Sequence, residues 1–89
     1  MLPVDTTSVN DAWGAVHELR YRQLLTALDL GWQIEEPVYL RPRYGQDGPR
    51  VYHFLMRRGP NVPLQLIVVP ECSEVETFVE REGLRVQAR

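Results

Sequence analysis

The stretch RVYHFLMRRGPNVPLQLIVVP at residues 50–70 decides the fold of this chain. Successive side chains of a β-strand point to opposite faces of the sheet, so residues two apart share a face. Residues 50–58 carry bulky side chains on both faces: Val51, His53 and Leu55 on one, and Tyr52, Phe54 and Met56 on the other. Residues 63–69 are again apolar on both faces, and a turn at residues 59–61 separates the two runs. We therefore predict two strands that lie inside a sheet or have one face against a partner.

The sequence before and after this stretch predicts two helices and one more strand. Apolar residues recur with helical spacing from Val9 to Leu28, and Gly31 follows as a left-handed cap. Residues 32–41 then alternate with a period of two, as in a strand; Pro37 cannot donate to a ladder, so this strand is at an edge or carries a bulge. After Pro70, a capping box of Ser73 with Glu76 predicts a second helix, which Gly83 ends.

We predict a single α+β domain at residues 8–89, preceded by a flexible N-terminal arm at residues 1–7. The expected order is helix, three-stranded antiparallel meander, helix (α-β-β-β-α), with the two helices on one sheet face. Short links between the strands favour antiparallel pairing, and residues 84–86 can add a short extended segment. Which face of the sheet the helices cover is left open by the sequence.

Composition removes several classes of chemistry. The chain has 89 residues and a formal net charge of −2, and its ten cationic side chains are all arginine. Without lysine there is no Schiff base and no phosphate-loop lysine. No nucleophile elbow, glycine-rich nucleotide loop or zinc-ligand spacing occurs. We therefore expect a non-catalytic protein without a cofactor or metal.

The sequence also favours a cytoplasmic protein that does not bind a membrane. Its single cysteine cannot form an internal disulfide. No apolar run approaches the length that spans a bilayer, and the first residues lack the pattern of a secretory signal.

Arginine and tyrosine are concentrated in the middle of the chain. Residues 41–58 contain five arginines and one acidic residue, Asp47. Arginine binds phosphate through two N–H groups, and aromatic rings stack on unpaired bases. The alternative function is therefore nucleic-acid or anion binding, through Arg41, Arg43, Tyr44, Arg50, Arg57 and Arg58. A simpler explanation is a solvent-exposed sheet edge in a protein whose GC-rich coding favours arginine over lysine.

The order of elements resembles that of the double-stranded RNA-binding domain. That family grips phosphates with a lysine-rich start to its second helix. Here the corresponding residues 71–76 read ECSEVE, which would repel phosphate. The resemblance is therefore one of element order, and we do not infer membership.

Four further residues are candidates for chemistry. We interpret Cys72 as a buried structural thiol, because cysteine is among the most buried residue types. His53 can pair with Glu35 or Glu36 on the adjacent strand, and a cross-strand hydrogen bond is the simpler interpretation. Glu36 shares a face with apolar residues, so it needs an arginine partner or exposure.

Protein association is the function that the sequence favours, either as a homodimer or with another protein. Apolar side chains on both faces of two strands exceed what two short helices cover. The predicted interface consists of Tyr52, Phe54, Met56, Ile67 and Val69, or of their neighbours on the opposite face. The acidic residues 71–82 of one subunit can also meet the arginine-rich strand of another.

Overall fold

The computed structural model describes residues 18–42 and 50–88, which form two helices and a four-stranded mixed sheet. The described part of the first helix is residues 18–29. The other elements are β1 (Gln33–Arg41), β2 (Val51–Arg57), β3 (Gln65–Pro70), α2 (Ser73–Arg81) and β4 (Val86–Ala88). The predicted α+β class is confirmed. The predicted arm at residues 1–7 and the start of the first helix lie outside the described residues.

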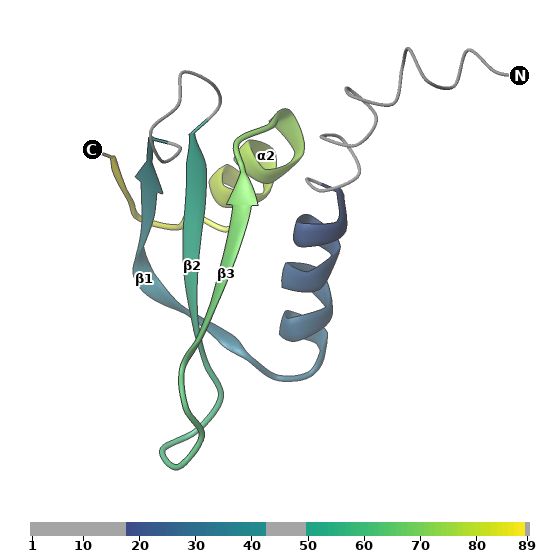
Figure 1. The fold of residues 1–89 in the computed structure, drawn as a ribbon, viewed down its shortest axis with the longest axis vertical. Coiled ribbons are helices and arrows are strands. Elements are labelled where there is room, and N and C mark those ends of the chain that lie inside the picture. Colours follow the sequence, from purple (N-terminus) through teal and green to yellow (C-terminus); the bar gives the residue numbers. More distant parts are fainter. Residues whose placement is uncertain (1–17, 43–49, 89) are drawn as a thin grey trace, which may run out of the picture.

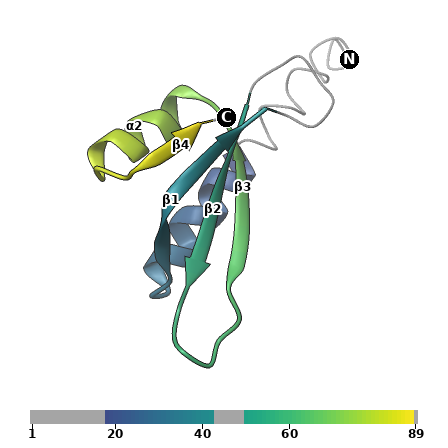
Figure 2. The same ribbon diagram turned by 90° about the vertical axis from the view of Figure 1, so that its left-hand side faces the viewer.

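The sheet has the strand order β3-β2-β1-β4 (Figures 1 and 2). β2 pairs with β1 and with β3 in antiparallel fashion, whereas β4 runs parallel to β1. The expectation of a three-stranded sheet was therefore wrong by one strand. The Val38 N–H donates to the Arg85 carbonyl at 2.8 Å, and the Arg85 N–H donates to the Glu36 carboxylate at 2.7 Å. These two bonds bring the chain after α2 alongside β1.

Strand β1 carries the irregularity that Pro37 predicts. Glu35 lies opposite Leu55 and Tyr39 opposite His53, so four steps along β1 match two steps along β2. Proline offers no N–H to a ladder, and a bulge removes the need for one. Since β1 lies between β2 and β4, the bulge is the correct alternative and the sheet edge is not.

Both helices end in the same hydrogen-bonded motif. Gly31 has φ 98° and Gly83 has φ 64°, in the left-handed region that glycine enters without a steric cost. After the first helix, the Trp32 N–H donates to the Ala27 carbonyl at 3.0 Å; after α2, the Leu84 N–H donates to the Val79 carbonyl at 3.1 Å. These are Schellman motifs, which satisfy carbonyls that the helix leaves free. The prediction that Gly31 and Gly83 end the helices is confirmed.

The start of α2 differs from the prediction by one residue. Ser73 is the first helical residue, and the N-cap is Cys72, whose Sγ accepts a hydrogen bond from the Val75 N–H at 3.5 Å. Glu74 and Glu76 lie in the first turn, where the positive end of the helix dipole stabilises carboxylates.

One hydrophobic core receives side chains from the sheet and from both helices. Phe78 of α2 is at its centre. The ring of Phe78 lies 6.3 Å from that of Phe54 on β2 and 6.1 Å from that of Tyr21 on the first helix, both edge to face. The buried members of the core are Leu24, Val38, Leu40, Tyr52, Phe54, Met56, Val69, Val75, Phe78 and Val79. Phe78 thus connects the two helices to the sheet.

Replacing Phe78 tests this connection. We expect Phe78→Ala to lower the free energy of unfolding by about 3–5 kcal/mol, because it removes a buried aromatic ring and leaves a cavity. Leu25→Ala is the matched control on an exposed helix position and should change stability by less than about 0.5 kcal/mol. Urea denaturation followed by circular dichroism measures both; equal effects of the two changes would contradict the assignment of Phe78 to the core.

Candidate interaction site

Four of the five predicted interface residues lie in the core. Tyr52, Phe54, Met56 and Val69 are at most 5% exposed, and Ile67 is partly buried against them. These side chains belong to the hydrophobic core of their own chain, so they have little surface left for a partner. Burial therefore argues against these residues as an interface, and the other predicted alternative, their neighbours on the opposite face, stays open.

The opposite face of the sheet, here called the outer face, carries apolar and aromatic side chains. Cross-strand partners share a face, so the register places Tyr39, His53 and Val68 in one row and Glu35, Leu55 and Leu66 in the next. Leu66 is 55% exposed and Leu55 is 36% exposed, while the other row is half-buried. The outer face is therefore an apolar surface with Glu35 at one side.

His53 lies within this face and not beside a carboxylate. Its partners across the ladder are Tyr39 and Val68, which corrects the predicted pairing with Glu35 or Glu36. Burial, and secondarily the positive charge of Arg41, lowers the pKa of His53. At neutral pH the ring is therefore uncharged, which suits an apolar contact.

The arginines of the predicted cluster are engaged within the chain. Arg50 donates two hydrogen bonds to Glu71, at 3.2 and 2.9 Å, and Arg57 donates to Glu35 at 2.8 Å. The Arg41 guanidinium lies 4.9 Å from the centre of the Tyr39 ring. Two of these charges are thus neutralised and a third covers an aromatic ring.

Arg58, the remaining described member of the cluster, lies apart from Arg50. The Arg58 guanidinium lies 5.9 Å from the Trp32 ring, at the other end of β2 from Arg50. Arg43 and Tyr44 lie outside the described residues. The structure therefore does not gather the described arginines into a single free cationic surface.

Two glutamates beside Arg50 have opposite electrostatic environments. The hydrogen bond from Arg50 lowers the pKa of Glu71. The hydrogen bond with Glu71, followed by burial and the charge of Glu71, raises the pKa of Glu76. The Glu71 contribution to stability is present above the ordinary carboxyl pKa and is lost as the pH falls. Glu76 has the opposite effect. Its ionisation lowers the stability of the fold as the pH rises through its raised pKa.

A neutral replacement of Glu76 tests this arrangement. We expect Glu76→Gln to raise the melting temperature at neutral pH, because it removes the charge that faces Glu71. In acid, where Glu76 is protonated, the variant and the original protein should melt together. Glu80→Gln removes a charge that acts on Glu76 more weakly, so it should raise the melting temperature less. Melting curves recorded across the acidic and neutral pH range measure this effect. A difference in melting temperature between Glu76→Gln and the original protein that does not depend on pH would contradict the repulsion between Glu76 and Glu71.

Cys72 and Glu36 have structural roles. Burial raises the pKa of the Cys72 thiol, and its Sγ caps α2, so it is not an activated nucleophile. Glu36 is exposed, which is one of the two alternatives that the sequence left open, and it accepts a hydrogen bond from the Arg85 backbone N–H. In residues 18–42 and 50–88, no group of side chains is suited to holding a metal ion, and no helix there is long and apolar enough to cross a membrane.

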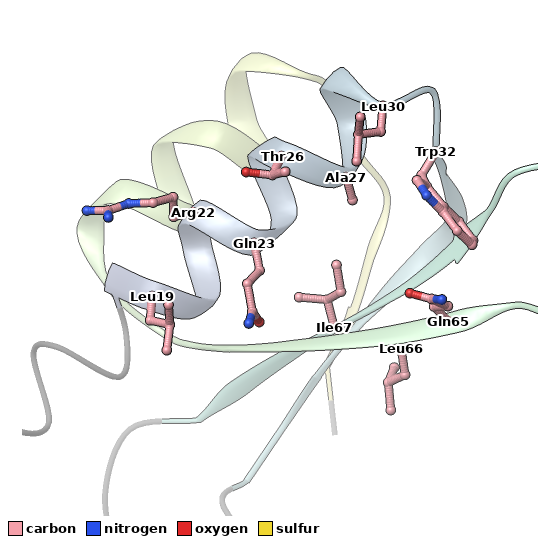
Figure 3. Close-up of a pocket in the computed structure, with 10 residues that line it drawn as sticks. All are labelled: Leu19, Arg22, Gln23, Thr26, Ala27, Leu30, Trp32, Gln65, Leu66 and Ile67. Atoms are coloured by element: carbon pink, nitrogen blue, oxygen red, sulfur yellow. The ribbon is translucent and has the colours of Figure 1, made fainter.

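A groove lies between the first helix and β3 (Figure 3). Its volume is about 480 Å³. Leu19 and Leu30 on the helix are 53% and 59% exposed, and in Figure 3 Ile67 points from β3 toward the helix while Leu66 points away from it. The described residues that line it are Leu19, Arg22, Gln23, Thr26, Ala27, Leu30, Trp32, Gln65, Leu66 and Ile67.

The sequence prediction missed this groove. Two features of the sequence could have indicated it. Leucines widen the apolar surface of the first helix beyond a single stripe, and residues 59–70 contain no charged side chain.

Comparison with known proteins adds no relative. No protein-family model, no curated protein and no solved structure matches the chain.

Proposed function

We propose that the protein acts by association, as a homodimer that pairs two outer faces. In this proposal the three antiparallel strands form a meander, both helices lie on the core face, and the outer face meets a second copy. The observation that carries it is the exposure of Leu55 and Leu66 on a face whose other members are half-buried apolar or aromatic groups. Contiguous apolar surface on a small domain is typical of a contact site.

Size and charge support the same proposal. A domain of 89 residues buries a modest share of its surface, and dimerisation adds apolar burial that the monomer lacks. At the centre of the outer face stand Tyr39, His53 and Val68, with His53 uncharged at neutral pH. Charged groups, such as the ion pair of Arg57 with Glu35, lie at its side. An apolar centre with a polar rim is the usual anatomy of a protein interface.

Nucleic-acid binding has weaker support. It needs free guanidinium groups on one surface. Arg50 and Arg57 are already paired with carboxylates, and Arg41 covers Tyr39. We therefore keep it as the second function to test, by measuring whether any affinity for nucleic acid falls steeply with salt.

The homodimer is tested by molar mass. We expect size-exclusion chromatography with light scattering to give a dimer at low and at high salt, because apolar contact is not screened by ions. Leu55→Glu should convert it to a monomer. Leu25→Glu is the matched control, because Leu25 has the same 36% exposure but lies on the first helix; this variant should remain a dimer.

Three results would count against this proposal. If the unaltered protein is a monomer at low and at high salt, it does not self-associate. A dimer that Leu55→Glu leaves intact places the contact on another surface. A dimer seen at low salt alone would instead indicate pairing of arginines with the acidic residues of α2.

A further inference from the structure

The free edge of β3 presents unpaired backbone groups. Among the described strands, β3 pairs with β2 alone. The Glu71 N–H donates to the Arg50 carbonyl of the neighbouring strand at 2.7 Å, so the backbone of Glu71 faces β2. Backbone direction alternates along a strand. Ile67 and Val69 therefore also face β2, whereas Leu66 and Val68 turn their N–H and C=O groups toward the open edge.

Among the features that usually prevent another strand from pairing, this edge has a proline at its end, Pro70, but neither a charged side chain nor a bulge. Natural edge strands carry charged side chains or bulges, or are covered by other elements. Residues 59–70 contain no charged side chain, and the register of β3 with β2 runs without a shift from Gln65 to Pro70. Pro70 belongs to the outward-facing set, so its missing N–H leaves the pairing with β2 intact.

The first helix lies alongside the β3 edge, behind the sheet in Figure 2, and leaves a groove between itself and β3. The groove between helix and strand is lined by Leu19, Ala27 and Leu30 from the helix side and by Ile67 from β3. A strand added to β3 would direct every second side chain into this groove.

The groove has one charged group in its described lining, Arg22. Arg22 pairs with Glu18 at 3.3 Å, and both side chains are 70% exposed. Such a pair contributes little, so an incoming carboxylate can replace Glu18. In Figure 3, Arg22 and Leu19 lie at one end of the groove, and Leu30 and Trp32 at the other.

We infer that the β3 edge binds an extended segment of another protein as an added strand. The segment carries alternate apolar side chains for the groove and a carboxylate at the Arg22 end. The inference rests on the proposed function in one respect, that the protein works by association, but it uses a different surface and a different partner.

A second copy is the weaker candidate for this edge. If two β3 strands pair edge to edge, each copy brings its own first helix to the side of the junction. Since that helix already lies alongside the β3 edge, the two helices compete for the same space. A single extended segment brings no helix, and the groove has room for its side chains.

An NMR titration with synthetic peptides tests the inference. The probes alternate valine with threonine and carry one glutamate, at the first or at the last position; a version with lysine in place of glutamate is the charge control. We expect saturable shifts at the Leu66 and Val68 amides. Leu66→Pro, which removes an outward N–H, should weaken binding about tenfold relative to Leu66→Thr, which keeps it.

Reversing the charge at position 22 tests whether Arg22 selects a carboxylate in the peptide. Arg22→Glu should reverse the preference, so that the lysine peptide binds better than the glutamate peptide. Arg20→Glu changes the same charge on the same helix outside the groove lining and should leave the preference unchanged. If the peptides cause no shifts at β3, or bind the proline and threonine variants equally, the inference is wrong. A parallel measurement of molar mass separates this outcome from failure of the homodimer.

Discussion

The structure depends on one constraint: β2 carries bulky side chains on both faces, and the hydrophobic core takes one of these faces. Tyr52, Phe54 and Met56 reach the core, where Phe54 contacts Phe78. Alternation then leaves Val51, His53 and Leu55 on the other side. The same strand backbone that buries Tyr52, Phe54 and Met56 directs the other three side chains to the outer face. The apolar character of the outer face is therefore a consequence of how the core is built.

The positions of the helices have local causes. Each helix ends in a Schellman motif at a glycine with positive φ, and each motif turns the chain directly into a strand. After Gly83 this turn adds β4 beside β1. After Gly31 it leads into β1, and the first helix lies behind the sheet in Figure 2. The helix therefore contributes Tyr21 and Leu24 to the core while Leu19 and Leu30 stay at the groove.

Much of the fold is predictable because it follows from local chemistry. Period-two alternation predicts the strands, Gly31 and Gly83 mark the helix ends, and Pro37 marks the bulge. A short extended segment was expected at residues 84–86, but neither its pairing as a fourth strand, at Val86–Ala88, nor the cap at Cys72 was predicted. β4 depends on hydrogen bonds between residues far apart in the sequence. Serine is the preferred N-cap residue in sequence terms, but the backbone is extended at Cys72, so Cys72 takes that position.

The candidate site was less predictable for a similar reason. Alternation divides β2 into two faces, but the sequence does not say which one the helices cover, and burial argues against the choice of Tyr52, Phe54 and Met56 for the interface. The predicted arginine cluster does not form a free cationic surface, because Arg50 and Arg57 pair with Glu71 and Glu35. These carboxylates lie outside the arginine-rich stretch, so the pairing could not be read from it. The groove combines a helix and a strand about forty residues apart, so no local pattern describes it.

Amide hydrogen exchange along β3 in dilute solution is the most direct test of the central claim, that this part of the sheet is built with an uncovered edge. The account predicts an alternating pattern. The Ile67 and Val69 amides, bonded to β2, should exchange slowly, and the Leu66 and Val68 amides, facing outward, should exchange fast. Slow exchange at all four positions would show that the edge is already covered and would contradict the account.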